Sequence, residues 1–222
     1  WTGNDKQPFV SAVAINGNKI VAVGNEKSVK KFATKNTQTI DLAGKFVMAG
    51  ANDSHVHFLG SSMGLFQVDL TDAKNLADAQ SIIAKFAKEN PNAPWITGTG
   101  LQYTIFPTTL PHRKDIDAIV NDRPVYIRAY DGHTAWANSK ALEIAGVTTK
   151  TEFKGFGEIV RDEKGEPTGV FKEGAMGLIS RNIPSPTREL EIAALKKGMQ
   201  NASSLGITSI QNAHGSLREV EL

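Results

Sequence analysis

Beyond residue 50 the sequence alternates between short β-branched segments and longer segments with helical spacing of apolar residues. This alternation restricts the fold more than any other feature, because strands that alternate with helices form a parallel sheet covered by helices. Four segments are expected to be such strands: residues 46–52, 95–98, 124–130 and 207–212. A complete (β/α)8 barrel needs eight strands and roughly 250 residues of its own. The 222-residue chain therefore fits two α/β architectures, the first part of a barrel or a complete open sheet.

The segments between these strands carry helix signals. Helices are expected over residues 71–89, 112–120, 139–146 and 185–206. The third is bounded by a cap at Asn138 or Ser139 and by Gly146. In the fourth, Ser185 is the expected N-cap and Pro186 the first helical residue. The apolar stripe expected on this last helix consists of Ile192, Leu195, Met199 and Ala202.

Glycine positions indicate several turns. Asn16-Gly17 separates two β-branched runs and predicts a hairpin, because both residues tolerate positive φ. A second hairpin is expected around residues 162–165, between strands 158–161 and 167–171. Gly98 and Gly100 are expected to form a tight turn at the end of the strand that begins at Trp95.

The first 48 residues read as a β unit with little helix. Its expected strands are residues 10–15, 19–23, 39–42 and 46–48. The change of pattern that follows predicts two parts: a small β-sandwich portion over residues 1–48 and an α/β portion over residues 49–222. No internal repeat or low-complexity linker interrupts the second part.

Composition excludes several classes of function. The absence of cysteine excludes a cysteine nucleophile and any cysteine-ligated metal site. The net charge is 25 − 23 = +2 with both signs interspersed, so no nucleic-acid partner is expected. No apolar run approaches the ~18 residues of a membrane span, so no membrane partner is expected. The chain starts at Trp1 with no signal-peptide pattern, and we expect that the natural start has been removed. None of this decides the compartment.

The chemistry is concentrated in Asp53-Ser-His55-Val-His57, which follows an apolar segment. Because the side chains of a strand alternate, all three residues are expected on one side, with both imidazoles reaching one metal ion. Neutral imidazole binds zinc, iron, nickel or manganese, and Asp53 is expected to orient a ligand or contact the substrate. A His-x-His pair often occurs by chance, so the spacing alone leaves the metal role open.

At this point the sequence resembles the amidohydrolase superfamily, specifically the amidohydrolase-3 group of YtcJ-like and N-substituted formamide deformylase-like enzymes. The resemblance runs in the family's order from about residue 10 to residue 213. It rests on these segments: Ile40–Gly50, Asp53–His57, Trp95–Gly100, Asp115–Ala118, Asp122–Val125, Asp131–Leu142, Pro167–Val170 with Glu173, and Gly206–Ser209. The resemblance favours the barrel over the open sheet: a truncated part of a (β/α)8 TIM-like barrel with a small N-terminal β-sandwich portion.

The resemblance also implies a reaction. Members hydrolyse carbon–nitrogen bonds of small amide-type substrates with one or two divalent ions, zinc being the first expectation. Two further histidines and the aspartate that handles the proton would come from chain beyond residue 222. No catalytic residue is therefore expected within these residues, and the chain alone is expected to be inactive. The alternative, from a different class, is a complete non-catalytic module that binds a metal or another ligand.

Further site residues are expected from the same comparison. The expected metal ligands are His55 and His57, with either Glu173 or Lys172 as the residue that bridges two ions. The alternative for Glu173 is a solvent-exposed acid in the first turn of a helix, where it has no metal role. His133 in its loop is expected to contact the substrate, with Asp53 and with Trp95 as a pocket wall. His112 and His214 are expected at the surface. Exposed strand edges predict self-association, so a homo-oligomer is a possible state.

Overall fold

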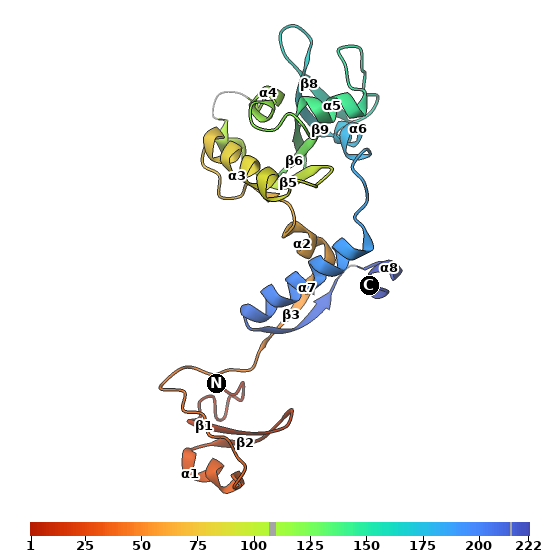
Figure 1. Ribbon diagram of the computed structural model, residues 1–222. Helices are drawn as coiled ribbons and strands as arrows, with labels where there is room; N and C mark the ends of the chain where they lie inside the picture. Colours follow the sequence, from red (N-terminus) through yellow and green to blue (C-terminus); the bar gives the residue numbers. More distant parts are fainter. Residues whose placement is uncertain (107–109, 214) are drawn as a thin grey trace. The chain divides into compact units, whose positions relative to one another are not determined.

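The computed structural model describes residues 1–106, 110–213 and 215–222 (Figure 1). Two compact units are present. The first comprises residues 1–55 and 202–211, and the second comprises residues 56–201 and 212–222. Within the described ranges, no helix combines the length and apolar character needed to cross a membrane.

The first unit opens with an antiparallel hairpin of β1 (Ala12–Asn16) and β2 (Lys19–Gly24). The pairing of Asn16 with Lys19 leaves Gly17 and Asn18 as the turn, one residue later than expected. Gly17 has a φ of +62°, which suits the left-handed conformation of a hairpin turn. The predicted hairpin is thus confirmed. It is followed by α1 (Glu26–Val29) and the 3-10 turn η1 (Lys30–Phe32).

The expectation of strands at residues 39–42 and 46–48 is wrong. Residues 39–50 have no regular secondary structure, and the next strand, β3 (Ala51–Val56), begins only at Ala51. A turn through Ala43 and Gly44, both at positive φ, interrupts the segment. Apolar composition alone does not make a strand, since a ladder partner is needed as well, and the sheets described here give these residues none.

Strand β3 pairs with β10 (Ile207–Asn212) in a two-stranded sheet. Ala51 N–H donates to the Gly206 carbonyl at 2.8 Å, and Ala213 N–H donates to the Val56 carbonyl at 2.8 Å. The bonded positions move in the same direction along both segments, from Ala51 and Gly206 to Val56 and Ala213, so the two strands are parallel. Two segments far apart in the sequence, both expected to be strands, therefore lie side by side.

The second unit contains a six-stranded sheet in the order β4-β5-β6-β7-β9-β8. Its strands are β4 (Val68–Asp69), β5 (Ile96–Leu101), β6 (Val125–Ala129), β7 (Thr134–Ala137), β8 (Gly157–Arg161) and β9 (Pro167–Glu173). Pairing is parallel from β4 to β6 and antiparallel from β6 to β8. The expectation of one parallel sheet that includes 46–52 and 207–212 is therefore wrong. A hairpin follows β6 directly, and β3, which begins at Ala51, forms a separate sheet with β10.

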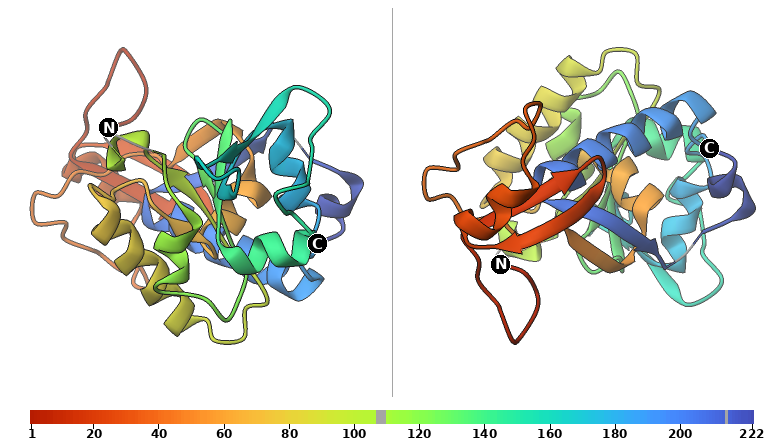
Figure 2. Two further views of the ribbon diagram at one scale, coloured as in Figure 1. Left: turned by 90° about the horizontal axis from the view of Figure 1, so that it is seen from above. Right: turned by 90° about the horizontal axis from the view of Figure 1, so that it is seen from below.

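Side chains of the six-stranded sheet alternate between two cores. Val125 and Ile127 face one core, which α3 (Leu76–Glu89) and α4 (Arg113–Asp117) complete. Tyr126 and Phe171 face the other, against α5 (Ser139–Ala145) and α6 (Gly177–Ser180). In the ribbon views, α3 and α5 lie on different sides of the strands (Figures 1 and 2). A sheet with helices on both faces must be apolar on both, which explains the continuous apolar run at 124–130.

Gly98 and Gly100 lie inside β5 and not in a turn, which corrects the expectation for them. A Cβ atom on Gly98 would lie 2.7 Å from Val68 Cβ and 2.7 Å from Ile127 Cδ1. The residue is therefore small because the neighbouring strands pack closely against it. After β5 the chain forms the 3-10 turn η2 (Tyr103–Ile105).

The remaining helices of the second unit are α2 (Phe58–Gly64), α7 (Arg188–Ser204) and α8 (Leu217–Val220). The fully buried residues of the long helix are Glu191, Ala194 and Gly198, none of which belongs to the expected stripe. Of that stripe, Ile192, Leu195 and Ala202 are half-buried, so the expectation holds only in part. Gly198 packs directly on Ser62 of α2, and the carboxylate of Glu191 accepts from Arg218 Nη2 at 2.8 Å. Close helix packing and one ion pair select this face, and Met199 stays 54% exposed.

Helix boundaries follow caps. Asn75 caps α3, four residues after the earliest start expected, and α7 starts at Arg188, three residues beyond Ser185. His112 caps α4 in a capping box with Asp115, in keeping with its expected place at a helix start. Helix α5 runs between Asn138 and Gly146, whose φ is +65°, as predicted.

The cap of α5 also holds the second unit together. Asn138 is fully buried, and its side-chain oxygen accepts from Val125 N at 2.9 Å and from Ala141 N at 3.1 Å. Its amide nitrogen donates to the Val120 carbonyl at 3.0 Å and the Arg123 carbonyl at 2.9 Å. Two acceptor and two donor positions satisfy the amide completely. One side chain thus joins the segment between α4 and β6, the start of β6 and the start of α5.

Replacing Asn138 by alanine is expected to lower the free energy of unfolding by about 3 kcal/mol or more, because several buried backbone groups lose their partners. Asn75 is the matched control, since it caps α3 with an exposed side chain that accepts from Asp78 N. Asn75→Ala should cost only about 1 kcal/mol. Urea unfolding of both variants measures the difference, and equal losses would contradict the central role of Asn138.

Candidate functional site

The chain places several polar side chains at one edge of the six-stranded sheet. Strands β5 and β6 are parallel, and β9 shares their direction because β7 is antiparallel to both β6 and β9. Their carboxyl ends therefore lie at the same edge, which is where open α/β sheets bind ligands. The residues at these ends, together called the carboxyl edge, are Tyr103, Tyr130, Asp131, His133, Thr134 and Glu173.

Glu173 and His133 form the central contact of the carboxyl edge. The Nδ1 atom of His133 lies 3.1 Å from Glu173 Oε1 and Oε2. The backbone joins the same residues, since Glu173 N–H donates to the His133 carbonyl at 2.9 Å. The hydrogen bond to Glu173 and the charge of its carboxylate raise the pKa of His133 above its ordinary value. The side chain of Glu173 is 34% exposed and that of His133 is 65% exposed, so a ligand has access to both.

The backbone of Glu173 is strained. It is one of two non-glycine residues at positive φ in the described ranges, with φ +51° and ψ −132°. This region is normally left to glycine, and a longer side chain there costs roughly 1–3 kcal/mol. The strain lies where β9 ends and the 3-10 turn η3 (Gly174–Met176) begins. Such strain is typical of functional sites, where the surrounding structure keeps a side chain in place.

The opposite strand is shaped to accept this bend. Gly157 is paired with Glu173, and a Cβ atom there would lie 2.7 Å from Ala175 N and 2.8 Å from the Lys172 carbonyl. Gly174 N–H donates to the Phe156 carbonyl at 3.1 Å, which anchors the far side of the bend. The position of Glu173 is thus built into the β8–β9 hairpin.

Asp131 organises the turn that carries His133. Asp131 Oδ1 accepts from His133 N–H at 2.9 Å, and Gly132 between them has a φ of +78°. The hydroxyl of Tyr103 lies 3.0 Å from Asp131 Oδ2 and 2.8 Å from Thr134 Oγ1. A phenol has one proton, so it can donate to the carboxylate while accepting from the threonine. Burial of its ring raises the pKa of Tyr103, which keeps the hydroxyl protonated.

Lys172, the other residue considered for bridging two ions, is engaged differently. Its Nζ lies 2.7 Å from Glu158 Oε2 on the neighbouring strand β8. An ammonium in an ion pair offers no lone pair to a metal ion. Its assignment as a ligand stays a prediction, and the geometry favours Glu173.

Asp53, His55 and His57 do not share one strand. Strand β3 ends at Val56, and His57 is the N-cap residue of α2, with φ −101° and ψ +77°. The two-residue alternation of a strand therefore does not extend to His57, which corrects that part of the expectation. Asp53 Oδ1 accepts from His55 N–H at 3.1 Å. Residues 1–106, 110–213 and 215–222 contain no group of three or more His, Asp or Glu placed to hold a metal ion, and His214 lies outside these ranges. The metal role of the two histidines stays a prediction.

Trp95 lies far from where a substrate wall was expected. It precedes β5, at the end of that strand opposite Tyr103, and packs against the core that contains Tyr126. Its contact with a substrate remains a prediction that the carboxyl edge does not support.

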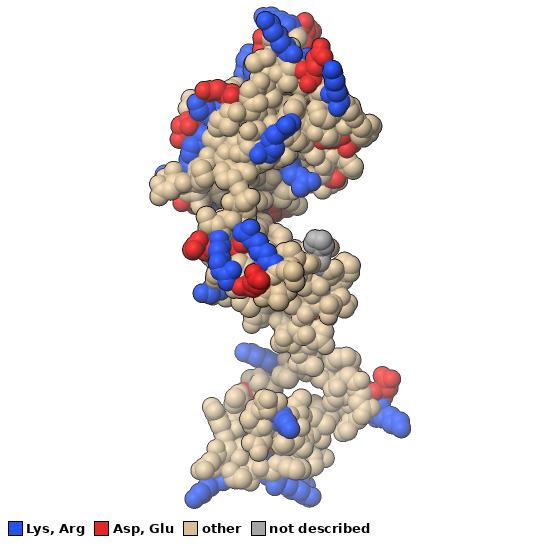
Figure 3. Space-filling view, turned by 90° about the vertical axis from the view of Figure 1, so that its right-hand side faces the viewer, with Lys and Arg blue, Asp and Glu red and all other residues tan. Residues whose placement is uncertain are grey.

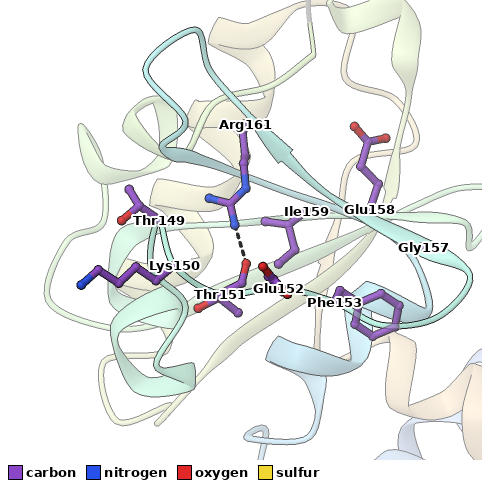
Figure 4. A pocket seen from close by; sticks show the side chains of 9 residues that line it. All are labelled: Thr149, Lys150, Thr151, Glu152, Phe153, Gly157, Glu158, Ile159 and Arg161. Atoms are coloured by element: carbon purple, nitrogen blue, oxygen red, sulfur yellow. Dashed lines mark hydrogen bonds between the residues drawn. The ribbon is translucent and has the colours of Figure 1, made fainter.

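An open hollow of about 560 Å³ lies on the β8 side of the sheet (Figure 4). Its walls are formed by Thr149, Lys150, Thr151, Glu152, Phe153, Gly157, Glu158, Ile159 and Arg161. The guanidinium of Arg161 donates to the carbonyls of Thr151 at 2.5 Å and Gly165 at 2.8 Å. This cation therefore holds two loops together.

Charge is mixed on the surface of the second unit. On the face drawn in Figure 3, Lys and Arg side chains alternate with Asp and Glu side chains. That face has no single-sign patch of the kind that binds nucleic acid. The expectations of no nucleic-acid partner, no membrane partner and a homo-oligomer stay predictions.

Sequence reasoning identified His133 and Glu173 separately but not as a pair, and it missed Tyr103 and Tyr130. The position of the two tyrosines could have indicated them, because Tyr103 and Tyr130 come shortly after the last residues of β5 and β6. Residues at strand ends of α/β folds are favoured for ligand contact.

Comparisons with known proteins confirm the resemblance seen in the sequence. A family model described as "Amidohydrolase family" matches residues 38–222. Protein LONG AFTER FAR-RED 3 of Arabidopsis thaliana is 31% identical over 95% of this chain and 36% of its own length. N-substituted formamide deformylase of Arthrobacter pascens is 27% identical over 100% of this chain and 42% of its own length.

A solved structure supports the same relation. The crystal structure of an uncharacterized metal-dependent hydrolase from Pyrococcus horikoshii is similar at a TM-score of 0.62 and 28% identity. The similarity covers 90% of this chain and 38% of that one. The fold is thus a mixed α/β fold similar to metal-dependent hydrolases, and the chain spans well under half the length of these relatives.

Glu173→Gly is expected to be more stable than Glu173→Ala by about 1 kcal/mol, because glycine removes the strain at positive φ while both variants lose the His133 contact. Glu158 on β8 is the matched control, since its backbone is an ordinary strand. There the order should reverse, with glycine roughly 0.5–1 kcal/mol less stable than alanine. Chemical denaturation of the four variants tests this, and the same order at both positions would show that Glu173 is unstrained.

The pKa of His133 is expected to depend mainly on Glu173. Because the pKa of His133 is raised above 6.5 in the folded chain, the pair contributes to folding at pH values below 6.5. That contribution is lost as the pH rises through the folded pKa. NMR titration of the metal-free protein should show that Glu173→Gln lowers this pKa more than Asp131→Asn does, since Asp131 acts only through its charge. An unchanged value in Glu173→Gln would contradict the pairing.

Proposed function

Because this chain belongs to the amidohydrolase family, we propose that it is part of a metal-dependent hydrolase that cleaves carbon–nitrogen bonds of small, amide-type, non-peptide substrates. The observation that carries the proposal is the strained Glu173 in contact with His133, at the carboxyl edge of a fold shared with metal-dependent hydrolases. A substrate and a metal ion need accessible polar groups held in place, and this pair provides them.

The proposed architecture is the first part of a (β/α)8 barrel with a small N-terminal β-sandwich portion. The proposed division is residues 1–48 and 49–222. The parallel pairing of β3 with β10 supports the barrel architecture, because (β/α)8 barrels are built from parallel neighbouring strands. The remaining barrel strands, two further histidines and the aspartate that handles the proton are proposed to lie in chain outside these residues, since the relatives are longer.

The residue types proposed as ligands suit one or two divalent ions, with zinc the first candidate. His55 and His57 offer imidazole nitrogens, and Glu173 offers a carboxylate, the ligand types that zinc takes in catalytic sites. A bound divalent ion supplies hydroxide near neutral pH and polarises the carbonyl oxygen. His133 is proposed to hydrogen-bond the substrate while its Nδ1 keeps Glu173 oriented. Asp53 is proposed to support His55 through the hydrogen bond that the His55 N–H donates to Asp53 Oδ1 within β3.

The test uses the full-length gene product, stripped of metal and reloaded with zinc, manganese or cobalt, on a screen of N-formyl and N-acyl amines. Metal-dependent hydrolysis is expected, and His55→Ala or His57→Ala should lower kcat/KM by at least about 100-fold, since even loss of groups that support ligands costs 10- to 100-fold. His112→Asn is the matched control, because asparagine preserves the cap of α4 and should leave the rate within about twofold.

Residues 1–222 alone are expected to be inactive in the same screen, because at most three of the required groups are present. Metal-dependent hydrolysis by these residues, abolished by His55→Ala, would contradict that expectation. If the full-length protein binds metal but hydrolyses nothing in the screen, the result would favour a non-catalytic binding module.

A further inference from the structure

We propose that Tyr103, Tyr130 and Asp131 form a subsite for a positively charged nitrogen, such as a substituted ammonium group, on the substrate. The inference rests on the proposed hydrolase function and adds a substrate class to it. It is carried by two features of the carboxyl edge, an aromatic pair of which Tyr130 is exposed and a carboxylate that forms no ion pair with any described residue.

The aromatic pair lies at the ends of two neighbouring strands. The rings of Tyr103 and Tyr130 have centroids 5.9 Å apart and planes inclined at 69°, so one ring presents its edge to the other. Tyr103 packs against the first core, which fixes it, whereas Tyr130 is 62% exposed. A large aromatic ring left in water beside a polar site is available to a ligand. The face of a tyrosine ring attracts cations within about 6 Å.

The carboxylate of Asp131 adds a full negative charge. Its hydrogen bonds come from neutral donors, the Tyr103 hydroxyl and the His133 backbone N–H. Among the ion pairs between described residues, none involves Asp131. These donors orient the carboxylate without cancelling its charge, so a cationic ligand would gain an electrostatic contact that a neutral one would not.

Two other cations lie near the carboxyl edge, Lys172 and Arg128. Lys172 is paired with Glu158. The guanidinium of Arg128 approaches Gly132, where Nη2 lies 3.1 Å from the position a Cβ atom would take. Arg128 shares its strand face with Tyr126, which belongs to the second core, whereas Tyr103 packs against the first. Among the described residues, neither Arg128 nor Lys172 forms an ion pair with Asp131, so its carboxylate keeps its charge.

The test compares two substrates of equal shape and different charge. They are the N-acetyl derivative of (2-aminoethyl)trimethylammonium and N-(3,3-dimethylbutyl)acetamide, in which carbon replaces the charged nitrogen. With the metal-loaded full-length protein, kcat/KM is expected to be at least about 10-fold higher for the cation, since cation–aromatic and carboxylate contacts of ordinary strength give that factor. A ratio near one would overturn the proposal.

Variants assign the preference to its residues. Tyr130→Leu and Asp131→Asn should bring the ratio to within about threefold of one, chiefly through slower hydrolysis of the cation. Phe156→Leu is the control, because Phe156 is an aromatic side chain with 84% exposure outside the subsite, and it should leave the ratio unchanged. Melting temperatures check that each variant folds. A ratio that survives Tyr130→Leu and Asp131→Asn would overturn the assignment.

A binding arm separates failure of the subsite from failure of the proposed function. If neither substrate is hydrolysed, the full-length protein is titrated with tetramethylammonium chloride, with sodium chloride at equal ionic strength as the reference, while the ring signals of Tyr130 are followed by NMR. A saturable shift that disappears in Asp131→Asn supports the subsite even though the proposed reaction fails. The absence of a shift overturns the subsite.

Discussion

The buried amide of Asn138 fixes the frame on which the carboxyl edge depends. Its four hydrogen bonds join the segment between α4 and β6, the first residue of β6 and the first turn of α5. Since Asn138 directly follows β7, the same side chain sets the register in which β6 and β7 pair, Tyr126 opposite Ala137 and Arg128 opposite Ala135. The turn at the other end of that hairpin carries Asp131 and His133. A fully satisfied polar group in the core thus determines where two site residues stand.

At the opposite end of the hairpin, the structure accepts local strain. Glu173 keeps a backbone conformation that glycine would adopt without cost, and Gly157 and Gly174 leave room for the bend. The strain is compatible with a stable unit because the elements around it are well packed. Phe171, two residues earlier, is completely buried, and Ala175, two residues later, is as well. The functional side chain is therefore held between two anchored positions.

Sequence reasoning succeeded where a local rule decides the structure. The β1–β2 hairpin, the capped helix α5 and the buried strand β6 all follow from turn residues, caps and an apolar run. It failed where the structure of a segment depends on the strand or helix that packs against it. Strand β7 is four residues long and buried on both faces, so it lacks the alternation that identifies a strand. Residues 39–42 have strand-like composition without a partner, and α7 buries Gly198 because Ser62 of α2 requires a close approach.

The same distinction applies to the site. His133 and Glu173 could be found singly, because each follows a strand, but their contact depends on the antiparallel order β6-β7-β9, which the sequence does not disclose. Tyr103 and Asp131 are linked across 28 positions by a hydrogen bond that depends on the same sheet. The parallel pairing of β5 with β6 places these two residues at the same edge, because both follow the carboxyl ends of neighbouring strands.

The two units differ in how their folding energy is supplied. In the first unit the hairpin leaves Ile15 and Ile20 about two-thirds exposed, and an isolated two-stranded hairpin is only marginally stable in water. In the second unit both faces of the sheet are covered, and Trp136, Phe171 and Ile127 are completely buried. Hydrophobic stabilisation grows with apolar area removed from water, so it is concentrated in the second unit. The carboxyl edge belongs entirely to that unit, and its strained and charged groups are held by the part of the chain with the largest buried core.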